Sequence, residues 1–140
     1  EILSALEGKV EKVEEKRERR VFIDVSKDSL HEVLRILASN GITHLSTISG
    51  VDVGERIELL YHLFGAGNAI TLRTWVPKDD ARVKTITTII PGAVLYEREV
   101  HDLLGVHFDA HPDLRPLVLP EDWESGPPLR KDWKGGERVE

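Results

Sequence analysis

Residues Ile57–Val76 read IELLYHLFGAGNAITLRTWV, and this stretch decides the predicted fold class. Apolar residues recur at every second position from 57 to 63, a period that indicates a strand with one buried face. The letters GAGN at 65–68 follow, and the alternation resumes from residue 70 until Pro77 ends it. Two alternating runs joined by a short, glycine-rich turn predict an antiparallel β-hairpin.

The residues before this hairpin predict two more strands and a helix. Leu45, Ile48 and Val51 are the apolar residues of a further predicted strand, which is separated from the hairpin by the turn letters DVGE. A helix is predicted from residue 30, capped by the aspartate or serine at 28–29 and ended by Asn40-Gly41. Before it, Val21–Val25 alternates as a short strand.

The predicted fold class is α+β, a mostly antiparallel sheet of about four strands covered by helices. Those four strands are Val21–Val25, Leu45–Val51, Ile57–Phe64 and Ala69–Val76. An amphipathic helix is expected within Glu1–Arg20, where apolar residues are spaced among charges. Residues 1–119 are predicted to form a single domain, and residues 120–140 an extended C-terminal docking tail.

Charge and histidine are densest in the run YEREVHDLLGVHFDAHPDLRPLVL, Tyr96–Leu119, whose first half predicts a third helix and whose second half predicts a turn and an extended segment. Residues 84–90 predict one or two helical turns before this helix, and Pro91 is expected to open it. Its apolar residues recur at helical spacing with the charged residues off that stripe, and Gly105 follows where a left-handed residue is favoured. Two interpretations are open: a capped amphipathic helix with a solvated charged face, or a docking surface on a rigid helix and a proline-fixed turn.

Composition excludes several classes of site. The 140 residues carry a formal net charge of −6, which argues against non-specific nucleic-acid binding, and they include no cysteine. A disulfide, a thiolate zinc site and an iron–sulfur cluster held by this chain's own thiolates are therefore excluded. No apolar stretch approaches the roughly 20 residues that span a bilayer, and no signal peptide is expected at the start. The lack of Cys and Met beside abundant Glu, Lys and Arg is a thermophile-like feature.

The chemistry-bearing residues do not predict an active site. His101, His107 and His111 are not expected to converge on a metal, because the helix ends at Leu104. Glu97 and Glu99 would point about 200° apart on a helix, so they cannot act as a pair on one substrate. We therefore predict no catalytic residue and no bound cofactor or metal ion for this chain.

The run resembles the signature of the 30 kDa subunit family of respiratory complex I. The matching residues are Glu97-Arg98-Glu99, Asp102-Leu103-Leu104-Gly105-Val106, Phe108, His111-Pro112-Asp113-Leu114-Arg115 and Leu117. Further similarity lies at His44-Leu45, Val51-Asp52, Tyr61-His62-Leu63, Pro120-Glu121-Asp122-Trp123 and Pro128-Leu129-Arg130-Lys131-Asp132. That family includes the matching subunits of membrane-bound energy-converting nickel–iron hydrogenases and related archaeal complexes.

The resemblance implies a non-catalytic docking subunit in the hydrophilic arm of a membrane-bound redox complex, peripheral on the cytoplasmic side of the membrane. Its partners would be the large subunit, which is either the hydrogenase large subunit or the 49 kDa homologue of complex I, and neighbouring iron–sulfur subunits. Iron–sulfur clusters, and a nickel–iron centre where present, would belong to those subunits. The short chain favours the hydrogenase branch, with complex I or a related archaeal oxidoreductase as the alternative. A free-standing assembly or regulatory module, or a free-standing enzyme, remains as a different class.

The predicted partner interface follows from the signature and the tail. It comprises Glu97, Arg98, Glu99, Asp102, His111, Asp113, Arg115, Trp123, Arg130 and Trp133. Arg98 is expected to be at least half-buried and paired with Glu97, Asp102 or a partner carboxylate, because a guanidinium suits interface ion pairs.

Overall fold

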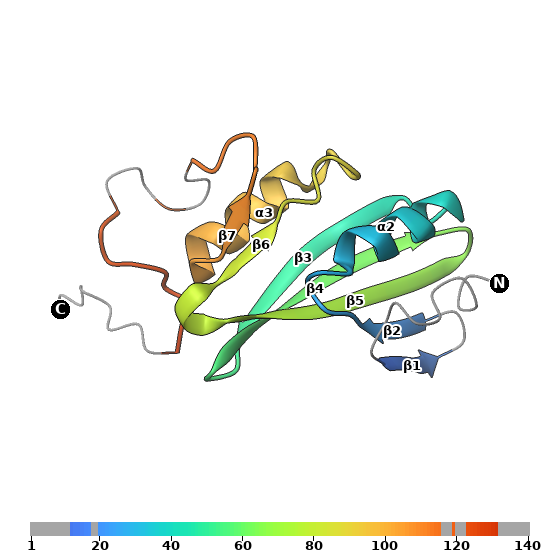
Figure 1. Ribbon diagram of the computed structural model, residues 1–140, viewed down its shortest axis with the longest axis horizontal. Coiled ribbons are helices and arrows are strands. Elements are labelled where there is room, and N and C mark those ends of the chain that lie inside the picture. The colour runs from blue at the N-terminus through green and yellow to red at the C-terminus, as the bar shows by residue number, and fades with distance from the viewer. Residues whose placement is uncertain (1–11, 18–19, 116–118, 120–122, 132–140) are drawn as a thin grey trace.

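The computed structural model describes residues 12–17, 20–115, 119 and 123–131 (Figure 1). The elements are β1 (Lys12–Arg17), β2 (Arg20–Asp24), α2 (Leu30–Ser39), β3 (His44–Asp52), β4 (Arg56–Gly65), β5 (Asn68–Pro77), the 3-10 turn η1 (Lys78–Asp80), β6 (Arg82–Lys84), α3 (Ala93–Leu104) and β7 (His107–Asp109). The α+β class is confirmed, and the four predicted strands are all present in one sheet.

The sheet has the order β1-β2-β5-β4-β3, and every neighbouring pair except β2–β5 is antiparallel. The hairpin predicted over residues 57–76 is β4–β5, joined by Ala66 and Gly67, both at positive φ as a tight primed turn requires. β2 runs parallel to β5 because α2, β3 and β4 lie between them in sequence. Asp24 and Arg73, which are register partners on these two strands, form a two-pronged ion pair with N–O distances of 2.8 and 3.1 Å.

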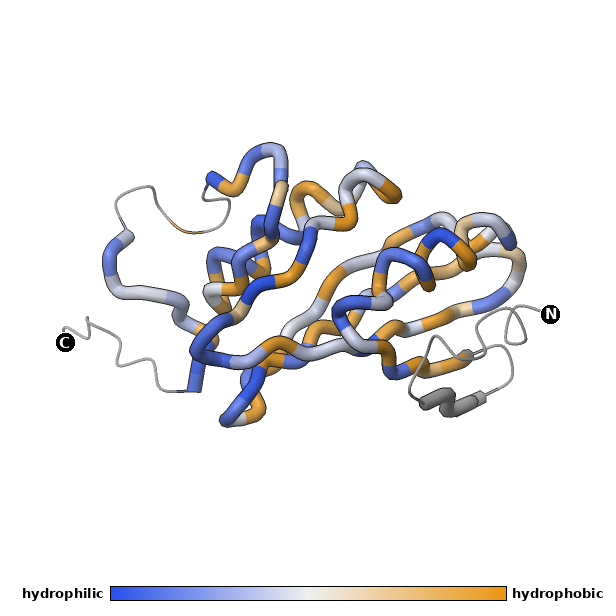
Figure 2. Tube along the Cα trace, in the orientation of Figure 1, coloured by the Kyte–Doolittle hydropathy of each residue, from blue (hydrophilic) through white to orange (hydrophobic). Residues whose placement is uncertain are grey.

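One face of the sheet packs against the helices and forms the core. Ile57, Leu59 and Tyr61 of β4 are fully buried, as is Leu72 of β5, and the apolar side of α2 meets the same cluster. Figure 1 shows α2 lying across the sheet and α3 beside β3, and Figure 2 shows apolar residues alternating along the strands. The opposite face carries exposed Trp75 with the Arg56 guanidinium 5.2 Å from its ring centre.

β6, α3 and β7 form a second small unit against β3. β6 and β7 pair in parallel as a two-stranded sheet, and α3 packs on β3. The helix approaches the strand closely at Gly50, where any Cβ would collide with the side chain of Leu104. A side chain at residue 50 would therefore push the helix away from the sheet.

Two local predictions were wrong, and a third, of one or two helical turns within residues 84–90, holds only for the second half of that segment. Residues 12–17 form strand β1 and not part of a helix, because the backbone hydrogen bonds to β2 outweigh the helical spacing of their apolar residues. Residues 1–11 and 18–19 of that predicted helix lie outside the described residues. Residues 84–90 contain the end of β6 and one turn, in which the Ile86 carbonyl accepts from the amides of residues 89 and 90. Pro91 precedes the helix, which begins at Ala93 with Gly92 as its N-cap.

Candidate functional site

The C-terminal end of α3 is a junction between the helix and the following chain. Gly105 ends the helix in the left-handed conformation, at φ 75°, as the sequence predicted. A helix end leaves four carbonyls without internal partners. The amide of Leu129 donates to the Leu103 carbonyl at 2.8 Å, and the Arg130 Nε donates to the Leu104 carbonyl at 2.6 Å. The described part of the tail, 123–131, therefore caps its own domain, with a cation at the negative end of the helix dipole.

Asp52 fixes the other end of this tail segment. Its carboxylate accepts hydrogen bonds from the Lys131 amide at 2.8 Å and the Gly54 amide at 2.9 Å, and it lies 2.8 Å from the Lys78 ammonium. Its side chain is only 1% exposed. Burial opposes its ionisation, but the bonds from these donors and the charge of Lys78 outweigh burial and lower the pKa of Asp52 to about 2. Sequence reasoning treated Asp52 as turn chemistry and as part of the family resemblance, but nothing in the sequence shows that the tail returns to it.

Glu97, predicted to face a partner, is fully buried within the chain. Its Oε1 accepts from the Thr85 hydroxyl at 2.5 Å and its Oε2 accepts from the Ile86 amide at 2.8 Å. Burial raises the pKa of Glu97 to about 7, although both hydrogen bonds act in the opposite direction. The sequence placed Glu97 and Asp102 off the buried stripe, and the structure corrects this. α3 is covered by β3 on one side and by the segments around β6 and β7 on the other.

His111 connects α3 to the loop that follows β7. Its Nδ1 accepts from the Asp113 amide at 2.8 Å, so in the neutral ring Nε2 carries the proton and donates to the Val94 carbonyl at 3.1 Å. Nε2 also lies 3.7 Å from the Glu97 carboxyl, and neither side chain has exposed area. His111 thus acts inside the chain to hold the loop against the helix.

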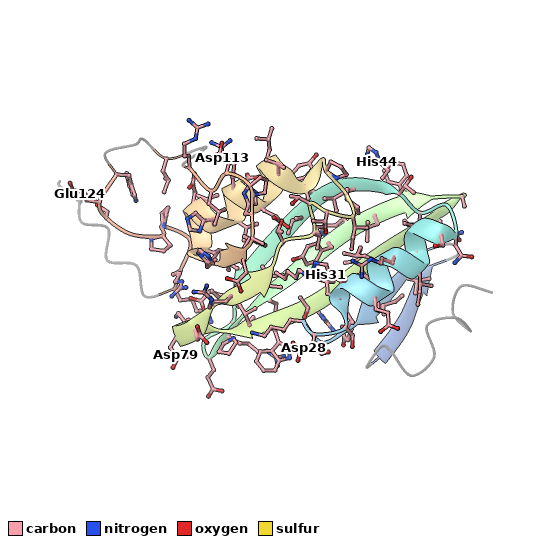
Figure 3. All side chains as sticks on the ribbon, turned by 45° about the horizontal axis from the view of Figure 1, so that its top comes forward. Asp28, His31, His44, Asp79, Asp113 and Glu124 are labelled. Carbon is pink, nitrogen blue, oxygen red and sulfur yellow. The ribbon has the colours of Figure 1, made fainter. Side chains whose placement is uncertain are left out.

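The exposed predicted residues lie on this loop and on the outer side of α3. Asp113 and Arg115 form a two-pronged ion pair at 2.8 Å for both bonds, with the arginine side chain 72% exposed, and Figure 3 shows Asp113 on the loop beside α3. The Arg115 side chain, through its hydrogen bond and charge, lowers the pKa of Asp113 to about 2. Arg98 is half-buried, as predicted, and its Nε donates to the Arg115 carbonyl at 2.9 Å.

The remaining predicted residues divide between the helix and the tail. Asp102 is buried and accepts from the Leu119 amide at 3.3 Å, whereas Glu99 is half-buried and borders a groove of about 260 Å³ between α3 and β3. Leu129, 58% exposed, forms the tail side of that groove. It belongs to the stretch 128–132 that carries the family resemblance, but it was not among the predicted interface residues. Trp123 is 37% exposed and donates from its indole to the Gly126 carbonyl at 2.8 Å. Trp133 lies outside the described residues, as do 120–122 and the rest of 132–140.

A larger hollow, about 410 Å³, lies between the start of α2 and the β6–β7 pair. Charged side chains of both signs line it, and two of the basic ones are bonded within the chain. Lys27 donates to the Arg82 carbonyl at 3.1 Å, and the Arg82 guanidinium pairs with Asp109 at 2.6 Å. Within the described residues no three His, Asp or Glu side chains are placed to hold a metal ion. The same residues include no helix that is long and apolar enough to cross a membrane.

Comparison with known proteins places this arrangement among respiratory subunits. Residues 23–139 match the family model described as the 30 kDa subunit of the respiratory-chain NADH dehydrogenase. The chain is 37% identical over 121 residues to a subunit of the F(420)H(2) dehydrogenase of Methanosarcina mazei, an alignment that covers 83% of this chain and 77% of that protein. It is 34% identical over 131 residues to NADH-quinone oxidoreductase subunit 5 of Thermus thermophilus, covering 84% of this chain and 63% of the relative.

A solved structure supports the same grouping. The structure of the membrane-bound sulfane sulfur reductase, an archaeal respiratory membrane complex, contains a chain that superposes with a TM-score of 0.72. The two are 31% identical, and the match covers 94% of this chain and 77% of the other.

Proposed function

The chain belongs to the family of the 30 kDa subunit of the respiratory-chain NADH dehydrogenase, and we propose on this basis that it is a non-catalytic docking subunit of a membrane-associated respiratory complex. One observation carries the docking role: the run and the described part of the tail together form a braced helix, loop and tail segment at the surface. The Asp113–Arg115 pair and the tail bonds to α3 hold this surface in one conformation before any partner arrives. Such preorganisation reduces the entropy lost on binding.

The partner we propose is the large subunit of the complex, with neighbouring iron–sulfur subunits beside it. Iron–sulfur clusters, and a nickel–iron centre if the complex is a hydrogenase, would be held there and not by this chain. The complex would sit with this arm on the cytoplasmic side of the membrane. These assignments come from the family resemblance.

Two branches of the family compete for this chain. Its thermophile-like composition favours a membrane-bound hydrogenase. The match to an F(420)H(2) dehydrogenase subunit, which extends over 77% of that protein, favours an archaeal oxidoreductase of the complex I type. The neighbouring large subunit distinguishes them, because paired Cys-x-x-Cys motifs in its sequence would supply the thiolate ligands of a nickel–iron centre.

The docking surface we propose comprises Arg98, Glu99, Asp113, Arg115, Trp123, Leu129 and Arg130. Arginine and aromatic side chains are enriched at protein interfaces and often dominate their binding energy. Arg115 is the most exposed of the three arginines whose positions are fixed here by hydrogen bonds, and Leu129 adds an exposed apolar side chain next to the groove.

The experiment is a quantitative pull-down of the large subunit by the tagged chain. We expect Arg115→Ala to weaken binding by about tenfold or more, the scale of an interface anchor. Arg56→Ala is the matched control, because Arg56 is also an exposed arginine paired with a carboxylate but lies on the far face of the sheet. Equal binding by both variants would refute the assignment of this surface.

A further inference from the structure

Beneath the proposed docking surface lies a buried polar cluster that docking does not use. It consists of Thr85 and Ile86 in the segment after β6, Glu97 on α3, and His111 in the loop after β7. Thr85, Ile86 and Glu97 are fully buried, and the His111 imidazole has no exposed area. Buried carboxyl groups are uncommon unless they are hydrogen-bonded, so the role of this one calls for an explanation.

Thr85 is bonded to three different elements. Its amide donates to the Asp109 carbonyl of β7 at 2.9 Å, and its carbonyl lies 2.6 Å from Nε2 of His31 on α2. Its hydroxyl meets Glu97 of α3. Figure 3 shows His31 on the side of α2 that faces this unit. The contact between Thr85 and Glu97 therefore links α3 to α2 and β7 through one residue.

His111 extends the same link to the docking loop. The Glu97 Oε1 that bonds Thr85 is also the atom 3.7 Å from the His111 ring, and the other ring nitrogen holds the Asp113 amide. Asp113 in turn orients Arg115. The Glu97 carboxyl is thus connected to the exposed guanidinium of Arg115 through two residues, His111 and Asp113.

The surroundings of Glu97 favour its neutral form. The titratable groups that face it are Tyr61 from β4 and His111, while His31 reaches it only through Thr85. The Tyr61 hydroxyl is fully buried and has no hydrogen-bond partner among the described residues. Burial, and then the charge of Glu97, raise the pKa of Tyr61. The two hydrogen bonds that Glu97 accepts favour its anion, but the cost of a buried charge without solvent is larger and favours the neutral acid.

We propose that Glu97 is a proton-dependent latch: while protonated it joins the segment after β6, α3 and the His111 loop into one unit, and loss of its proton loosens that unit. The direction follows from linkage. An acid whose pKa is raised in the closed state, to about 7 here, stabilises that state most at low pH. This stabilisation is lost as the pH rises from the ordinary value of a glutamate through about 7. The latch is a property of the chain itself and does not depend on the identity of the partner.

Amide hydrogen exchange of the full chain tests the latch. After correction for the intrinsic pH dependence of exchange, we expect local opening at the Ile86 and Asp113 amides to increase roughly tenfold between pH 6 and pH 8, as a closed-state pKa near 7 requires. Glu97→Gln mimics the neutral acid and should abolish that increase. Glu99→Gln is the matched control, because it removes a half-buried charge two residues away on the same helix and should leave the increase unchanged.

Either of two results would overturn the proposal. One is an unchanged pH dependence at Ile86 and Asp113 in Glu97→Gln, and the other is loss of that dependence in Glu99→Gln. If Glu97→Gln does not fold, the carboxyl ¹³C shift of Glu97 in the unaltered chain provides a second readout. A midpoint near the ordinary value of a glutamate, about 4.3, would refute the latch without any variant.

Discussion

Gly105→Ala should destabilise the chain in two ways that can be separated. The first is conformational: at φ 75° an alanine side chain costs about 1 kcal/mol relative to glycine. The second is steric, because a Cβ there would lie 2.8 Å from Pro127 Cγ and 3.2 Å from Arg130 Nη2. Moving these groups away would break the tail bonds to the Leu103 and Leu104 carbonyls, each contributing about 1 kcal/mol. The expected loss in unfolding free energy is therefore about 2 to 3 kcal/mol.

A double-mutant cycle separates the two costs. Urea unfolding is measured for the full chain and for a chain ending at Pro120, each with glycine or alanine at position 105. In the shortened chain only the conformational cost of about 1 kcal/mol should remain, so the coupling energy should be about 1 to 2 kcal/mol. Gly67→Ala is the control, because Gly67 has a similar φ of 79° in the β4–β5 turn, at the end of the sheet away from the tail (Figure 1). Its cost should be equal in both chains.

The cycle can contradict the structure in a simple way. If Gly105→Ala costs the same in the long and short chains within about 0.5 kcal/mol, residues 127–131 are not packed against the helix cap. If Gly67→Ala also shows coupling, the shortened chain has lost more than its tail contacts.

Two further predictions concern Asp52 and the tail. Because the pKa of Asp52 is lowered, its ionised carboxylate stabilises the fold above about pH 4, and this stabilisation is lost as the pH falls towards 2. When the unfolding free energy is measured at decreasing pH, the unaltered chain should show this loss and Asp52→Asn should not. Truncation after Pro120 should leave the far-ultraviolet circular dichroism of the folded domain unchanged but lower its melting temperature, because the caps on α3 are removed. The same truncation should weaken pull-down of the large subunit. An unchanged melting temperature would show that those caps are absent in solution, and undiminished pull-down would show that the tail is not a docking arm.

The sheet could be predicted because its signals are local. The alternation in β4 and β5, and the glycines in the turns, act over a few residues and are visible in the sequence. Gly105 was predictable for the same reason, since a helix stop needs only the residues next to it. β1 was missed because pairing with β2 decides its conformation, and the spacing of its own residues suggested a helix.

The internal polar contacts could not be predicted, because each joins residues far apart in the chain. Lys131 and Asp52 are separated by 79 residues, and Glu97 is 11 residues from Ile86 across a turn. A period of 3.6 residues indicates one buried side of a helix. It cannot show which side is buried: the structure buries the side with Ala93, Glu97, Val100 and Leu104, so a carboxyl group lies within it. Asp102 lies on another side of the helix and accepts from the Leu119 amide.

The family signature therefore contains two kinds of residue, which sequence alone treats as one. Glu97 and His111 bond within the chain and have no exposed side-chain area, whereas Arg115 is held by Asp113 and its side chain is exposed at the surface. Loss of assembly after a change at Glu97 would accordingly report the shape of the surface, not a contact across it. Only a change at an exposed member such as Arg115, in a variant whose unfolding free energy is unaltered, measures docking directly.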